Sequence, residues 1–165
     1  MQKLKVLLVE DDPHIAHCLI KKMKPSCEVE LATHKNQALH LLDRNQYDVL
    51  VTDLNLTHQQ DLHGLTILKK AKSKELYSIV LSQVDDIKVT RDAYELGCDH
   101  FLNKLFFETS LIPYLESYQR TKANDSKLDL LKRKFFTNDM NFLRELRNLL
   151  KVNLENQCLL LTGET

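Results

Sequence analysis

Short apolar runs recur along the first two thirds of the chain, and each is bounded by polar or turn-forming residues. The first run, LKVLLV, is almost continuously apolar, which is typical of a strand that is covered on both faces. The second run, CEVELA, alternates apolar and polar positions, which also indicates a strand. The runs predict five strands, at residues 4–9, 27–32, 47–53, 77–82 and 98–103.

The segments between these runs carry apolar residues at helical spacing, so we expect a helix after each strand. The first helix begins at Pro13, because the first turn tolerates a missing N–H, and it ends by Pro25. Thr33 is placed to cap the second helix. Either Asp85 or Asp86 starts the fourth helix. Its C-cap is a glycine.

A third helix follows Gly64, and a last helix begins near Ser110, with Pro113 in its first turn. Five strand and helix pairs with short connections predict an open parallel sheet with helices on both faces, which is a doubly wound α/β fold. In such a sheet the functional site lies at the carboxyl ends of the strands. The residues that directly follow each strand are therefore the candidates for function.

Residues able to carry chemistry stand at four of these strand ends. They are Glu10, Asp11 and Asp12 after the first strand, Asp53 at the third, Ser82 at the fourth and Lys104 at the fifth. Converging carboxylates repel one another, and a hard divalent cation such as Mg²⁺ relieves the repulsion. A carboxylate nucleophile, Mg²⁺, a lysine and a hydroxyl together suit the transfer of a phosphoryl group to an aspartate.

Each of these residues taken alone has an ordinary structural explanation. An aspartate after a strand is commonly a turn or cap residue. Ser82 alone could cap the next helix, and Lys104 alone would be a solvated surface lysine. Their conjunction at the ends of different strands, in the order that the chemistry needs, favours the functional interpretation.

The motifs LLVEDD, VLVTDLNL, IVLS and DHFLNK resemble those of the response-regulator receiver domain of two-component signalling, over about residues 3–120. The resemblance implies a flavodoxin-like receiver fold with a five-stranded parallel sheet. It also implies that Asp53 accepts a phosphoryl group from a partner sensor histidine kinase. On this interpretation the chain is a switch and not an enzyme, apart from its own phosphotransfer and dephosphorylation.

The resemblance also assigns the metal ligands. Glu10 and Asp11 match the acidic pair that holds Mg²⁺ beside Asp53. The backbone carbonyl of Asn55 would complete the metal shell, and Asp12 is a secondary acidic candidate.

Three further residues match the switch of the family. Ser82 corresponds to the hydroxyl that moves toward the phosphoryl group, and Phe101 to the aromatic switch residue. Lys104 corresponds to the lysine that binds the phosphoryl group.

The chain departs from the family pattern in three places. Leu105 follows the lysine where proline is usual, and we expect a trans bond there because a cis bond to a non-proline residue costs roughly 3 kcal/mol. Thr57 replaces a proline, and Gly64 comes about three residues later after Asp53 than the usual glycine, so the loop between them is longer. Gln83 stands where alanine or glycine is typical.

A second segment follows the receiver. The polar stretch RTKANDSK reads as a linker or as a solvated helix turn. An amphipathic helix and an apolar run ending in GET then follow. We therefore divide the chain into a receiver domain (1–120), a linker (121–138) and a last segment (139–165).

The last segment resembles the start of the AAA+ ATPase domain in NtrC-like, sigma-54-dependent transcription activators, whose phosphate loop begins with the same three residues. The interpretation is a truncated activator; a helical tail unrelated to that domain is the alternative. The Gly-Lys pair that grips phosphates in such a loop is absent, so we expect no ATPase activity.

The leading hypothesis is a receiver that controls transcription. It would contact DNA only through domains absent from this chain, and a homodimer is a possible result of activation. A stand-alone receiver that signals by protein docking is the alternative. A carboxylate-nucleophile phosphohydrolase is a third hypothesis, but such enzymes typically have a second aspartate where this chain has Asn55.

Composition adds a few constraints. The 23 basic residues balance 23 acidic ones, which argues against a generally basic nucleic-acid-binding chain. The four cysteines lack CxxC spacing and lie in or beside apolar runs, which predicts buried free thiols and fits a reducing cytosol. No apolar run approaches the roughly 18 residues that span a bilayer, so we expect a cytoplasmic protein with no membrane segment.

Overall fold

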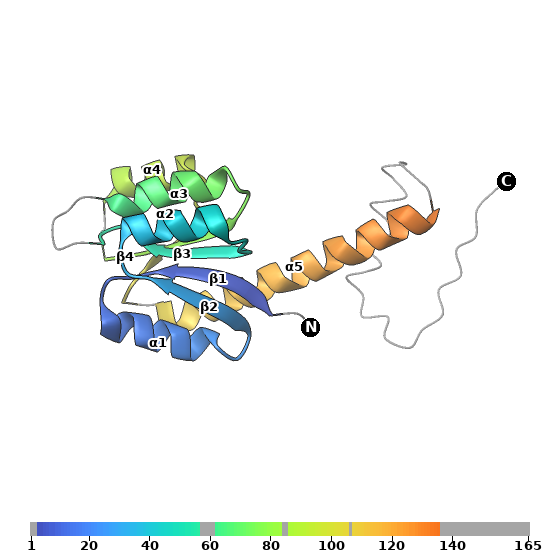
Figure 1. The fold of residues 1–165 in the computed structure, drawn as a ribbon, viewed down its shortest axis with the longest axis horizontal. Coiled ribbons are helices and arrows are strands. Elements are labelled where there is room, and N and C mark those ends of the chain that lie inside the picture. The colour runs from blue at the N-terminus through green and yellow to red at the C-terminus, as the bar shows by residue number, and fades with distance from the viewer. Residues whose placement is uncertain (1–2, 57–61, 84–85, 106, 136–165) are drawn as a thin grey trace. The chain divides into compact units, whose positions relative to one another are not determined.

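The computed structural model describes residues 3–56, 62–83, 86–105 and 107–135 (Figure 1). Its elements in chain order are β1 (Leu4–Val9), α1 (Pro13–Met23), β2 (Cys27–Ala32), α2 (Lys35–Arg44), β3 (Val49–Asp53), α3 (His63–Lys72), β4 (Tyr77–Ser82), α4 (Ile87–Glu95), β5 (His100–Asn103) and α5 (Phe107–Phe135).

The five strands form one parallel sheet in the order β2-β1-β3-β4-β5. Helices α2, α3 and α4 cover one face of the sheet, and α1 covers the other (Figure 1). Because both faces are covered, every residue of β3 is buried. The predicted doubly wound α/β fold is confirmed, with the flavodoxin-like strand order.

The main core lies between the sheet and the helices α2, α3 and α4. Leu7 and Leu50 from the sheet and Ile67 and Leu68 from α3 are completely buried in it. Burial of one such side chain contributes about 1.5–3 kcal/mol. This layer therefore fixes how the strands lie beside one another.

Strand register brings the carboxyl ends of the strands to one edge of the sheet. Val9, the last residue of β1, pairs with Thr52, which precedes Asp53. Ser82, the last residue of β4, pairs with Asn103 at the end of β5. The residues that follow these positions therefore share one edge of the sheet.

Local signals set the start of α1 and the end of α4. Pro13 is the first residue of α1, and Asp12 caps that helix by accepting hydrogen bonds from the N–H groups of His14 (2.8 Å) and Ile15 (3.1 Å). Gly97, with a φ of +98°, ends α4 in a Schellman motif, as the predicted glycine C-cap requires.

Two other predicted caps have different outcomes. Asp86 caps α4, where its carboxylate accepts a backbone N–H at 2.7 Å, while Asp85 lies outside the described residues. Thr33 does not cap α2, because the N-cap is His34. The Gln37 carboxamide reaches back and accepts the N–H of Thr33, the residue before the N-cap, at 2.9 Å.

Two strands begin later than predicted. β5 begins at His100 and not at residue 98, because the N–H of Cys98 donates to the carbonyl of Ala93 and so belongs to the end of α4. β3 begins at Val49 and not at residue 47.

The last helix is longer than predicted. α5 begins at Phe107 and not near Ser110, so Pro113 lies inside the helix and not in its first turn. Near its start, the Phe107 ring lies under the ammonium of Lys22 from α1, with Nζ 5.8 Å from the ring centroid. α5 continues to Phe135. The polar stretch RTKANDSK is therefore helical and is not an irregular linker.

The chain divides into two compact units, Met1–Leu115 and Glu116–Thr165. The five strands of the sheet belong to the first unit. The segment 139–165 lies outside the described residues, so its assignment stays a prediction. None of the helices in the described part of the chain is both long enough and apolar enough to cross a membrane.

The cysteines only partly follow the prediction of buried thiols. Cys27 and Cys98 are buried, but Cys18 is exposed. Cys18 lies on α1, whose buried stripe is formed by Ala16, Leu19 and Met23, and it falls on the outer face of that helix. Cys158 lies outside the described residues.

Candidate functional site

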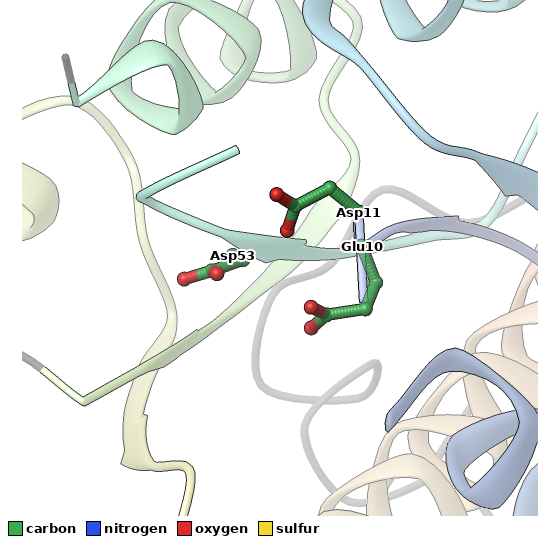
Figure 2. Close-up of side chains that lie close together, drawn as sticks. All are labelled: Glu10, Asp11 and Asp53. Atoms are coloured by element: carbon green, nitrogen blue, oxygen red, sulfur yellow. The ribbon is translucent and has the colours of Figure 1, made fainter. Parts of the chain in front are cut away.

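Three carboxylates lie together at the carboxyl ends of β1 and β3 (Figure 2). Glu10, Asp11 and Asp53 each offer an oxygen, and these oxygens lie within 4.8 Å of one another. Glu10 and Asp11 directly follow β1, and Asp53 is the last residue of β3. The ends of these strands meet because β1 and β3 are neighbours in a parallel sheet.

The ammonium group of Lys104 lies between two of these carboxylates. Its Nζ is 2.7 Å from Asp53 Oδ2, and it is 2.9 and 2.7 Å from Glu10 Oε1 and Oε2. Lys104, Glu10 and Asp53 are 9%, 1% and 6% exposed. Charges that are buried this deeply need close partners, because desolvation costs several kcal/mol per ion. The lysine therefore joins the ends of three strands through one buried ion-pair network.

Burial governs the protonation of this network. It raises the pKa of Asp53 and that of Glu10, and the attraction of Lys104 offsets only part of the effect. Burial also disfavours the charge of Lys104, but the hydrogen bonds and charges of the two carboxylates outweigh it and raise the lysine pKa. Two buried carboxylates against one ammonium leave an excess of negative charge, which a further cation would neutralise.

The oxygen atoms of the pocket suit a hard divalent cation. Among the described residues, two buried oxygens have no hydrogen-bond donor: Asn55 Oδ1, and Glu10 Oε2, which has only its ion pair with Lys104. Glu10, Asp11 and Asp53 bring carboxylate oxygens together, and Asn55 lines the same cavity. Mg²⁺ and similar ions prefer such oxygen ligands. The adjoining cavity has a volume of about 460 Å³. The residues present therefore fit Mg²⁺.

Asp12 has a different position from its acidic neighbours. It lines the cavity, but its carboxylate is bound to the first turn of α1, where the N–H groups of Ile15 and His14 lower its pKa. It is not one of the three residues that bring oxygens together. Its own N–H donates to Glu10 Oε1 at 3.3 Å.

The two predicted switch residues lie on neighbouring strands. Ser82 is completely buried at the end of β4. Phe101 is half-buried on β5 and packs against the main core. The N–H of Phe101 donates to the hydroxyl of Tyr94 on α4, at 3.3 Å, which ties this strand to the neighbouring helix.

Gly64 is a structural part of the site that the sequence pattern did not identify as such. Its N–H donates to the carbonyl of Leu54 at 3.0 Å. A Cβ atom at this position would lie 2.3 Å from the carbonyl oxygen of Asp53, so no side chain fits. The sequence feature that could have indicated this packing is the single glycine after the third strand. Its distance from Asp53 was interpreted only as a measure of loop length.

The peptide bond before Leu105 is trans, as expected, since the described residues contain no cis bond. Gln83, the other departure at the strand ends, is exposed and lines the cavity. Thr57 lies outside the described residues.

A doubly wound sheet of this order, with an acidic cluster and a lysine at its carboxyl edge, defines the class of receiver domains. Residues 6–116 match the sequence model of the response regulator receiver domain, and the chain belongs to this family. The predicted family and fold are thereby confirmed.

Known proteins that are similar to this chain include a transcriptional regulator and a response regulator. The DNA-binding transcriptional regulator NtrC of Proteus hauseri is 28% identical over 136 residues, which cover 76% of this chain and 28% of NtrC. The response regulator MprA of Mycobacterium leprae (strain TN) is 27% identical over 127 residues, which cover 74% of this chain and 54% of MprA. The match therefore spans only part of the length of these curated relatives.

Solved receiver domains have the same fold. The receiver domain of the Francisella response regulator 1452 has a TM-score of 0.63 and 29% identity, and the match covers 72% of this chain and 99% of that one. The non-phosphorylated HemR receiver domain of Leptospira biflexa has a TM-score of 0.62 and 28% identity, with 70% and 94% covered.

Proposed function

We propose that this receiver domain is a phosphorylation switch in which Asp53 accepts a phosphoryl group from a sensor histidine kinase. The observation that carries the proposal is the buried ammonium of Lys104, 2.7 Å from the acceptor carboxylate and paired with Glu10 on its other side. A cation in that place holds the negative charge of an incoming phosphoryl oxygen next to the attacking carboxylate.

The reaction breaks a phosphorus–nitrogen bond and forms a phosphorus–oxygen bond. A carboxylate oxygen of Asp53 attacks the phosphorus atom, and the imidazole nitrogen of the donor histidine leaves with the bonding electron pair. The product is an acyl phosphate on Asp53. Lys104 and the hydroxyl of Ser82 then bind phosphoryl oxygens. Backbone N–H groups of Leu54 and Asn55 hydrogen-bond the Asp53 carboxylate and orient it.

Mg²⁺ is the proposed cofactor, and it would supply charge neutralisation between the carboxylates and the phosphoryl group. Glu10, Asp11 and Asp53 would hold it, together with the backbone carbonyl of Asn55. The side-chain oxygen of Asn55 is a further candidate metal ligand, since it is buried and accepts no hydrogen bond.

Control of transcription is the proposed output. Its support is the similarity to NtrC, which is a DNA-binding transcriptional regulator, and to the response regulator MprA. On this proposal, Ser82 and Phe101 move after phosphorylation and change the surface formed by α4 and β5. The changed surface favours a homodimer. The cytoplasmic homodimer then acts on DNA through further domains. The alternative output is docking of the receiver onto a partner protein.

The direct test is intact-mass spectrometry after incubation with acetyl phosphate and Mg²⁺. We expect the wild-type protein to gain one phosphoryl group and the Asp53→Asn variant to gain none. Asp48→Asn is the control, because Asp48 is also an aspartate beside β3 but its carboxylate accepts the N–H of Lys5 away from the site. If wild-type and Asp53→Asn proteins gain phosphate alike, the acceptor assignment is wrong.

A further inference from the structure

The turn that carries Lys104 is closed by a side chain. β5 is a four-residue strand at the edge of the sheet, and the N–H of Lys104 donates to the carbonyl of Ser82 at 2.9 Å. One residue farther along, the N–H of Leu105 donates to Oδ1 of Asn103 at 2.8 Å. A side-chain oxygen that accepts the N–H two residues ahead forms an Asx turn.

This turn directs one side chain inward and its two neighbours outward. Lys104 is 9% exposed, whereas Leu105 is 73% exposed and Asn103 is also exposed. The hydrogen bond between Leu105 and Asn103 is exposed to solvent, whereas the ion pairs of Lys104 with Glu10 and Asp53 are buried. The backbone of Lys104 is held from both sides, by the carbonyl of β4 before it and by the Asx turn after it.

The N–H that Asn103 binds in this turn exists because residue 105 is leucine and not proline. A proline fixes φ near −65° and removes the N–H, so it restricts the chain after the lysine by its ring. Leu105 has no such restriction, and its N–H is free to be bound by a side chain. The Asx turn thus supplies, through Asn103, a constraint that a proline ring supplies covalently.

We infer that Asn103 is a positioning residue for Lys104: its carboxamide oxygen fixes the turn that places the lysine ammonium between Asp53 and Glu10. Asn103 acts through the lysine and does not touch the phosphoryl group. The inference rests on the proposed function for its effect on phosphorylation. Its effect on the position of the lysine is independent of that function.

The experiment compares three variants of Asn103 with the wild-type protein. Alanine removes the acceptor, glutamine keeps the carboxamide but is one methylene too long for the same turn, and aspartate keeps the acceptor oxygen at the same distance. Phosphorylation by acetyl phosphate with Mg²⁺ is followed by intact mass. We expect Asn103→Ala and Asn103→Gln to react on the order of tenfold more slowly, and Asn103→Asp to stay within about twofold of the wild type.

A second readout does not depend on phosphorylation. Limited acylation with a succinimidyl ester, followed by peptide mass spectrometry, measures how accessible the Lys104 ammonium is. We expect its labelling to rise in Asn103→Ala and Asn103→Gln and to stay at the wild-type level in Asn103→Asp. The melting temperatures should stay close together, because Asn103 is exposed.

The donor side of the hydrogen bond provides a double-mutant control. Leu105→Pro removes the N–H, so adding Asn103→Ala to it should slow phosphorylation no further. An added loss equal to that of Asn103→Ala alone would show that Asn103 acts by another route and would overturn the inference.

The two proposals fail in different ways. If the wild type is phosphorylated on Asp53 and all three Asn103 variants match it in rate and in Lys104 labelling, the positioning role is wrong and the proposed function stands. If the wild type takes up no phosphoryl group, the proposed function is wrong, and the labelling pattern alone decides whether Asn103 positions the lysine.

Discussion

At Gly64 a hydrogen atom in place of a side chain allows α3 to begin directly against β3. The glycine N–H binds the carbonyl of Leu54, and a Cβ would lie 2.3 Å from the carbonyl oxygen of Asp53 and 2.6 Å from the Cα of Leu54. These neighbours are backbone atoms, which cannot rotate away as a side chain can. Even one methyl group must therefore displace the backbone of Asp53 and Leu54.

Replacement of Gly64 by alanine should lower both stability and phosphorylation. We expect the free energy of unfolding to fall by about 1–3 kcal/mol, the cost of overpacking a well-packed site. Phosphorylation of Asp53 should slow, because its carbonyl and carboxylate belong to the displaced residue. Urea denaturation and intact-mass time courses measure the two effects. Thr66→Ala, at an exposed position of the same helix, should change stability by no more than about 0.5 kcal/mol.

A Gly64→Ala variant with wild-type stability and wild-type phosphorylation would show that the backbone can move at no cost, contrary to the close packing described above.

At the scale of elements, helix faces and strand ends decide which thiols can react. Cys18 lies on the exposed face of α1, whereas Cys27 begins β2 and Cys98 lies in the turn between α4 and β5. Burial raises the pKa of Cys27 and that of Cys98 to about 11. At pH 8 only about one part in a thousand of such a thiol is thiolate. The three cysteines should therefore differ in their reaction with a disulfide reagent.

In a Cys158→Ser background at pH 8, we expect one thiol to react fast and two to react only slowly in the folded protein. Adding Cys18→Ser should remove the fast phase. The raised pKa values mean that the neutral thiols stabilise the fold below pH about 9, and that this contribution is lost as the pH rises through about 11. Absorbance of the released thiolate measures the rates, and three equal rates would contradict the burial described here.

The elements could be predicted from the sequence where one local cause decides them. Strands β1, β2 and β4 have the predicted bounds, because an apolar run bounded by polar residues has few other stable solutions. The N-terminus of α2 could not be predicted from Thr33, because the cap depends on which side chain reaches which N–H. The length of α5 was missed because its polar residues resemble those of a linker.

The candidate site could be predicted in large part because the parallel sheet brings its strand ends to one edge. The cluster of Glu10, Asp11 and Asp53 follows from that rule alone. The tight packing at Gly64 and the hydrogen bond of Asn103 could not be predicted, because each depends on the path of a loop. Loop paths depend on backbone angles and contacts that no periodic pattern encodes.

At the scale of the whole molecule, formal charge is balanced, but the site concentrates negative charge. Burial raises the pKa of Asp53 and that of Glu10, so in the metal-free protein their protonation stabilises the fold. That contribution is complete below their ordinary pKa values, 3.8 and 4.5, and is lost as the pH rises through the raised values. On the proposed function, Mg²⁺ would bind the ionised carboxylates and compensate for the loss over the same pH range.

Stabilisation by Mg²⁺ should therefore grow with pH. At ten times its dissociation constant at pH 7.5, the ion should add about 1.4 kcal/mol to the free energy of unfolding, and near pH 4.5 it should add almost nothing. Measuring the melting temperature with and without Mg²⁺ at each pH isolates this effect from the titration of other groups. Asp11→Asn should abolish most of the Mg²⁺ effect, because Asp11 supplies a ligand but takes no part in the ion pairs of Lys104. An Mg²⁺ effect that is equal at both pH values, or that is unchanged in Asp11→Asn, would place the ion elsewhere on the surface.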